Sequence, residues 1–211
     1  MPAFASTPAP VHTLWDAPQT AEQRLPGVWS VTTASHGGFV LSDERQAAMP
    51  KALRLESIYY EEDVDWSLVI LGFALEFRRL PIAGIGLQVE NARRSVRAWH
   101  PQRFSAFTGE DVPPSESHVL RRRAAYQAVI GQYASTSAFG DWADWVPKGM
   151  VGITFRKVES VDALGFARYT GEPIHGLVDQ ARYAERGDVE TFDSLAATRV
   201  ESTAPITKQV A

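Results

Sequence analysis

The segment from Val64 to Phe77 constrains the fold more than any other part of the chain, because most of its side chains are apolar. Apolar residues recur in it at spacings of three and four, which is the pattern of a helix face. Leucines make the opposite side apolar as well, and a helix that is apolar on most faces lies buried inside a domain. The segment therefore predicts one central, largely buried helix, with a buried strand over Leu68–Phe73 as the alternative. The residues that carry the pattern are Trp66, Leu68, Val69, Ile70, Leu71, Phe73, Leu75 and Phe77.

The same segment is too short to cross a bilayer comfortably, and Asp65 and Glu76 interrupt it near its ends. The first ten residues, MPAFASTPAP, contain no basic residue and no long apolar run, so we expect no secretory signal. The chain has no cysteine, which excludes disulfides and thiolate metal sites and is typical of a reducing compartment. We therefore expect a cytoplasmic protein with no membrane association.

Strand patterns occur in two parts of the chain. Val28–Ala34 is rich in β-branched residues, and the short apolar run Phe39–Leu41 follows it. The two predict a hairpin with residues 35–38 at its tip. Later, Met150–Val158 alternates between apolar and polar residues and predicts a strand, with Ala163–Tyr169 as its antiparallel partner.

Helix patterns lie between these groups of strands and after them. We expect helices after the N-cap residue Ser42, over Leu87–Trp99, from Ser115 to about Tyr133, and over Ile174–Glu185. This order predicts an α+β fold, in which a small antiparallel sheet of hairpins packs with several helices. The length of 211 residues and the weak patterning at both ends predict three parts: a flexible N-terminal extension (1–26), a single α+β domain (27–190) and a C-terminal tail (191–211).

The first candidate site combines the hairpin tip with an acidic segment. His36 is followed by two glycines, which let a ligand approach the backbone closely, and Glu61, Glu62 and Asp63 stand just before the predicted central helix. An imidazole with carboxylates suits a divalent metal site or acid/base catalysis. The alternative is that His36 only caps a turn and the acids only complement the helix dipole. The spacing matches no established metal motif.

The second candidate is a basic surface with interleaved aromatic residues, which suits contacts to phosphates and bases. The alternative is a solvated helix surface paired with acidic residues, which the net charge of −4 favours. The arginines are Arg93, Arg94, Arg97, Arg121, Arg122 and Arg123.

The third candidate is the loop GDWADWVP, in which Trp142 and Trp145 alternate with acids. Exposed tryptophans are favoured at protein interfaces, so the pair predicts contact with a partner. The alternative is that both indoles fold back onto the core.

Four segments resemble an uncharacterised family of bacterial domains: TASHGGFVLS (33–42), YYEEDVDW (59–66), WHPQRFSAFTG (99–109) and GDWADWVPKGMVG (140–152). The resemblance extends over about residues 28–187. It supplies no catalytic residues, but it implies a bacterial protein, frequent in alphaproteobacterial genomes and associated with plasmids, phages or integrated elements, where anti-defence proteins are common.

Three functions follow as hypotheses. The first is an interaction protein of a mobile element, with an anti-defence role, that binds a host protein or a protein–nucleic-acid complex. The second is a metal-dependent or acid/base hydrolase that acts on a phosphodiester-like bond through His36, Glu61, Glu62 and Asp63. The third is direct binding of nucleic acid by the arginines. No nucleotide-cofactor motif is present, because Gly84 and Gly86 lack the rest of the dinucleotide fingerprint.

Overall fold

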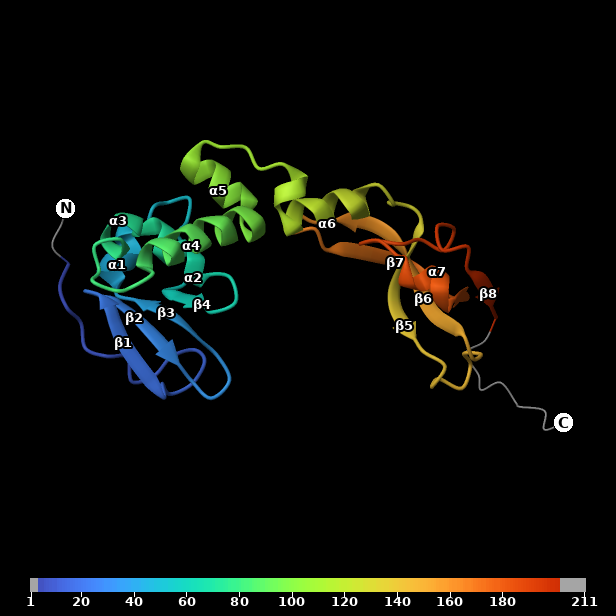
Figure 1. Cartoon of the computed structure of the whole chain (residues 1–211), viewed down its shortest axis with the longest axis horizontal. Helices are drawn as coiled ribbons and strands as arrows, with labels where there is room; N and C mark the ends of the chain where they lie inside the picture. The colour runs from blue at the N-terminus through green and yellow to red at the C-terminus, as the bar shows by residue number, and fades with distance from the viewer. Residues whose placement is uncertain (1–3, 202–211) are drawn as a thin grey trace. The chain divides into compact units, whose positions relative to one another are not determined.

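The computed structural model describes residues 4–201, which form two compact units (Figure 1). Unit 1 ends at Ser117 and unit 2 begins at His118. Each contains a four-stranded sheet whose strands pair only within that sheet, and each has its own hydrophobic core. The α+β class is confirmed. The chain nevertheless differs from the single domain expected over 27–190, because local periodicity does not record which core a helix or strand packs against.

The unit 1 sheet is fully antiparallel, with the order β1 (Thr20–Leu25), β2 (Val28–Thr32), β3 (Gly37–Leu41) and β4 (Tyr59–Glu61). The predicted hairpin is present as β2 and β3. The extension expected over 1–26 differs from the structure, since it contains β1, while residues 1–3 lie outside the described part. The sequence did not indicate β1 because its residues, TAEQRL, are mostly polar, and only the last of them is buried. Such a pattern is tolerated in an edge strand.

Helices cover one face of the unit 1 sheet (Figure 1). They are α1 (Asp43–Ala48), α2 (Trp66–Gly72), α3 (Ala74–Phe77) and α4 (Ile85–Trp99). The next helix, α5 (Pro101–Thr108), packs against α4, and a 3₁₀ turn follows at Pro114–Glu116. The predicted central helix is α2, whose Leu68, Val69 and Ile70 are completely buried. The strand alternative for this segment is wrong. α2 ends at Gly72 and α3 begins at Ala74, so that Phe73 is the cap residue of both helices.

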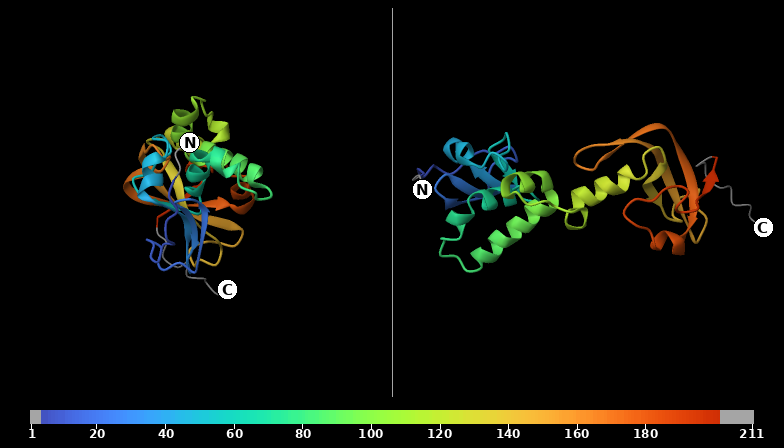
Figure 2. Two further views of the ribbon diagram at one scale, coloured as in Figure 1. Left: turned by 90° about the vertical axis from the view of Figure 1, so that its left-hand side faces the viewer. Right: turned by 90° about the horizontal axis from the view of Figure 1, so that it is seen from above.

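Unit 2 contains α6 (His118–Gln127), β5 (Tyr133–Phe139), β6 (Met150–Val161), β7 (Ala167–Asp179), α7 (Gln180–Ala184) and β8 (Thr198–Val200). Its strands pair antiparallel in chain order. Figure 2 shows α6 beside the long β6–β7 hairpin. Within residues 4–201, every helix is too short or too polar to span a bilayer.

Three sequence predictions for unit 2 need correction. The helix expected from Ser115 to about Tyr133 is shorter, because α6 ends at Gln127 and Tyr133 begins β5. The helix expected over Ile174–Glu185 is wrong in its first half, because Ile174–Asp179 belongs to β7 and pairs with β6. A neighbouring strand supplies these backbone hydrogen bonds, and local patterning does not record it. Part of the tail expected over 191–211 also belongs to the fold, as β8 and as a bridge between Thr191 and Ala134. Residues 202–211 lie outside the described range.

The environment of Tyr169 on β7 predicts that the stability of unit 2 changes with pH in the alkaline range. Its hydroxyl lies 3.4 Å from the Tyr126 hydroxyl on α6. Burial, and then this hydrogen bond, raise the pKa of Tyr169 above its ordinary value of 10.0. A raised folded-state pKa gives stability that is fully present below the unfolded value and is lost as pH rises through the folded value.

We therefore expect the free energy of unfolding of unit 2 to fall as pH rises above about 10. Tyr169→Phe should remove part of this dependence, because phenylalanine has no ionisable group. Chemical denaturation at several pH values between about 8 and 11, followed in both proteins, measures the effect. An identical pH dependence in the wild type and the variant would contradict it.

Candidate functional site

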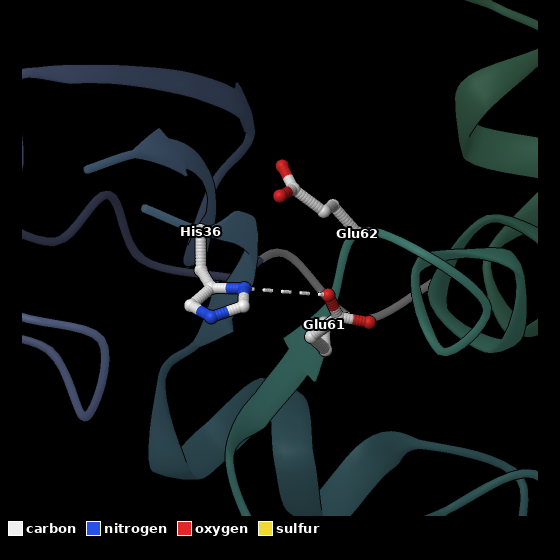
Figure 3. Close-up of side chains that lie close together, drawn as sticks. All are labelled: His36, Glu61 and Glu62. Carbon is white, nitrogen blue, oxygen red and sulfur yellow. Dashed lines mark ion pairs between the residues drawn. The ribbon is translucent and has the colours of Figure 1, made fainter. Parts of the chain in front are cut away.

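Three side chains that the sequence singled out lie together at one end of the unit 1 sheet (Figure 3). His36 precedes β3, Glu61 ends β4, and Glu62 follows directly. One ligand atom from each of the three lies within 4.8 Å of the other two. His36 Nδ1 is 4.0 Å from Glu61 Oε1, and the two side chains are 57% and 31% exposed. Residues about 25 positions apart thus form one solvent-accessible group, which we call the His–Glu trio.

Strand pairing brings the trio together. Gly38 on β3 is paired with Glu61 on β4, and the Glu62 amide extends the pairing by donating to the Gly37 carbonyl over 3.0 Å. The tip before β3 is held by Thr33, whose amide and hydroxyl donate to the His36 carbonyl over 2.7 and 2.9 Å. The backbone on both sides of the trio is therefore fixed by hydrogen bonds.

Both glycines after His36 have a specific steric role. A Cβ on Gly37 would lie 2.6 Å from Glu62 Oε2, so the missing side chain leaves space for that carboxylate. Gly38 has a φ of +148°, and a Cβ there would lie 2.1 Å from the Tyr60 carbonyl oxygen. The His-Gly-Gly motif and the Tyr-Glu-Glu motif are therefore complementary parts of one structure.

Asp63, the fourth predicted member, does not belong to the trio within the described residues. Its backbone amide instead donates to Glu61 Oε2 over 2.8 Å and so orients that carboxylate. This leaves one imidazole and two carboxylates as ligands, a mixed nitrogen and oxygen set that suits Zn²⁺ or Mn²⁺. Metal bonds of about 2.0–2.2 Å place neighbouring ligand atoms roughly 3 Å apart. The accessible side chains would close by about one to two ångströms to hold an ion.

A shallow, open cavity of about 270 Å³ adjoins the trio. Glu62 lines it and also belongs to the trio, so the two features share a carboxylate. Trp66 at the start of α2 and Gln88 on α4 contribute an indole and an amide, and strand residues form the rest of the wall. The sequence indicated Trp66 only as a helix residue and gave no signal for Gln88, because a helix–sheet cavity has no local pattern.

Two of the three candidate arginines in unit 1 are paired with acids of the same unit. Arg93 pairs with Glu110, and Arg97 pairs with both Glu110 and Glu116. Arg94 donates to a neighbouring side-chain amide. This arrangement resembles the salt-bridged helix surface given above as the alternative.

The other three arginines belong to unit 2. Arg121 lies 3.0 Å from Asp188, and Arg122 donates to the Leu164 carbonyl over 2.9 Å. Arg123 buries its Nε atom. The six predicted arginines are therefore divided between the two units, and most of their guanidinium groups contact partners within their own unit.

The two tryptophans of the GDWADWVP loop differ in exposure. Trp142 is 74% exposed, whereas Trp145 is 8% exposed and packs against Gly152 and His175. Only Trp142 presents its indole to solvent.

One known protein family matches more than half of the chain. A family described as "Domain of unknown function (DUF7007)" matches residues 8–130. The chain belongs to this family. The matched range includes the whole His–Glu trio and its cavity, together with α6 of unit 2. No curated protein and no solved structure matches the chain.

Proposed function

We propose that unit 1 binds a divalent metal ion through the His–Glu trio and hydrolyses a phosphodiester-like bond, acting in the cytoplasm. The observation that carries this proposal is the convergence of His36, Glu61 and Glu62 to within 4.8 Å. Three protein ligands leave coordination positions free for water and substrate, as in catalytic rather than structural metal sites.

Each residue has a distinct role in this proposal. His36 donates a ring nitrogen, and Glu61 and Glu62 donate carboxylate oxygens, which offset the charge of the ion. The Asp63 amide keeps the Glu61 carboxylate oriented, as outer hydrogen bonds do at metal sites. A bound divalent ion would lower the pKa of a coordinated water and polarise a phosphoryl oxygen. The adjoining cavity offers the substrate a place beside Glu62.

Metal binding is tested by calorimetric titration of the purified protein with Mn²⁺ and with Zn²⁺. We expect His36→Ala and Glu62→Gln each to weaken binding more than about tenfold, since even outer partners of metal ligands contribute that much. Their folds should be unchanged, because both side chains are exposed. Hydrolysis of bis(p-nitrophenyl) phosphate in the presence of the ion should fall in parallel.

His12→Ala is the matched control, because His12 is an exposed histidine of unit 1 that lies outside the trio. It should bind metal as the wild type does. If the His12→Ala and His36→Ala proteins bind metal equally well, or if the wild type binds none, the proposal is wrong. If metal binds and no phosphodiester is cleaved, the hydrolase function fails and the metal site remains.

A second candidate function is the binding of a host protein, including an anti-defence role on a mobile element. The exposed indole of Trp142 favours it, because tryptophan is enriched where proteins bind. Direct binding of nucleic acid receives less support, since the ion pairs of Arg93, Arg97 and Arg121 already engage these cations.

A further inference from the structure

We infer that the cavity beside the His–Glu trio binds the base of a nucleotide, so that the phosphate of the same nucleotide reaches the trio. This inference rests on the proposed metal site and names its substrate class. It depends on a structural fact: Glu62 both lines the cavity and belongs to the trio. A molecule seated in the cavity would therefore contact Glu62, one of the three proposed metal ligands.

The walls of the cavity have the chemistry that a nucleobase requires. Trp66 supplies an aromatic surface, and bases stack on such surfaces whatever their sequence. Gln88 supplies an amide that both donates and accepts hydrogen bonds, and Ser30 on β2 supplies a hydroxyl. Thr32 also lines the cavity, but its hydroxyl is hydrogen-bonded to the Thr20 hydroxyl over 2.7 Å. The base edge carries donors and acceptors that the Gln88 amide and the Ser30 hydroxyl can match.

The size and charge of the site point to the same ligand. A volume of about 270 Å³ lies just below the usual range for drug-sized ligands, so the cavity suits a small group such as one planar ring system. The carboxylates of Glu61 and Glu62 repel a phosphate unless a cation stands between them. Nucleotide binding should therefore require the metal, and the base should add affinity beyond that of the phosphate.

The experiment compares adenosine 5′-monophosphate with ribose 5-phosphate, which carries the phosphate without the base. In the presence of Mn²⁺, calorimetry should show the nucleotide binding about tenfold more tightly. Without Mn²⁺, both should bind weakly. The full-length protein is used throughout.

Variants of the cavity locate the base. Gln88→Ala and Trp66→Leu should bring the affinity for the nucleotide down to that for ribose 5-phosphate, while leaving Mn²⁺ binding unchanged. The Gln88 variant should disturb folding less than the Trp66 variant, because Trp66 also packs against the core. Gln102→Ala on α5 is the matched control, since Gln102 is exposed and does not line the cavity. It should behave as the wild type.

Each outcome decides one of the two proposals. Equal affinities for the two probes in the presence of bound Mn²⁺ overturn the nucleotide inference and leave the metal site standing. The nucleotide inference is equally overturned if Gln88→Ala binds the nucleotide as tightly as Gln102→Ala does. If the wild-type protein binds no metal, the proposed metal site is wrong, and the nucleotide inference that rests on it is wrong as well.

Discussion

Replacing Arg45 with methionine is expected to lower the free energy of unfolding of unit 1 by about 3 kcal/mol. Arg45 on α1 is completely buried and forms two hydrogen bonds of 2.8 Å with the Glu76 carboxylate on α3. Its Nε also donates to the Pro26 carbonyl over 2.6 Å. The guanidinium lies 4.8 Å from the centre of the Phe73 ring.

The loss arises because Glu76 remains behind without its cation. Its side chain is only 23% exposed, so water replaces the guanidinium incompletely. The Pro26 carbonyl also loses its donor, which adds the cost of an unsatisfied acceptor. The methionine recovers part of the packing but none of the charge-assisted bonds.

Chemical denaturation measures the loss, and hydrogen exchange read by mass spectrometry locates it. Peptides from residues 4–117 should exchange faster in the variant, and peptides from residues 118–201 should not change. The double variant Arg45→Met/Glu76→Leu should recover much of the stability, because a buried ion pair replaced on both sides by apolar groups costs little. A loss below about 1 kcal/mol in the single variant would show that the ion pair contributes no more than a surface pair.

Gly38→Ala is expected to destabilise unit 1 by about 3 kcal/mol and to weaken metal binding. The new Cβ would lie 2.1 Å from the Tyr60 carbonyl oxygen and 2.8 Å from the Trp15 indole. The carbonyl belongs to the backbone of β4, so it cannot move without disturbing the pairing of β3 with β4. The φ of +148° adds strain for any residue with a side chain.

The same pairing positions the His–Glu trio, so displacement of β4 separates Glu61 from His36. Denaturation and metal titration of the variant therefore both test whether the close pairing of β3 with β4 at Gly38 is needed. Gly86→Ala is the matched control, because a Cβ on Gly86 in α4 meets nothing within 4 Å. Alanine should stabilise this helix by about 0.5–1 kcal/mol and leave metal binding unchanged. If Gly38→Ala were as stable as Gly86→Ala, the close contact with β4 would be disproved.

Much of the local structure could be predicted from single segments of the chain. The β2–β3 hairpin, the Ser42 cap of α1 and the burial of α2 each depend on residues that are near one another in sequence. Ser42 accepts a hydrogen bond from the Arg45 amide, as an N-cap residue does. β1 was missed because polar edge strands have little hydrophobic alternation, and the first half of the expected Ile174–Glu185 helix was wrong because β6 pairs with it.

The candidate site was likewise predictable only in part from the sequence. The sequence indicated that His36, Glu61, Glu62 and Asp63 were candidates, but nothing in their spacing states which of them meet. The pairing of β3 with β4 decides that Glu61 and Glu62 face His36 while Asp63 contributes only its amide. The cavity lined by Gln88 and Trp66 has no sequence signal, since its walls come from separate strands and helices.

The sequence by itself determined the α+β class, the central apolar helix and the residue types available for chemistry, because periodicity, capping and turn preferences act over a few residues. Only the tertiary structure decided the division after Ser117, the pairing of Arg93 and Arg97 with acids, and the convergence of the His–Glu trio. These features arise from hydrogen bonds and charges between residues far apart in the chain. Such contacts exist only once the strands have paired and the cores have packed.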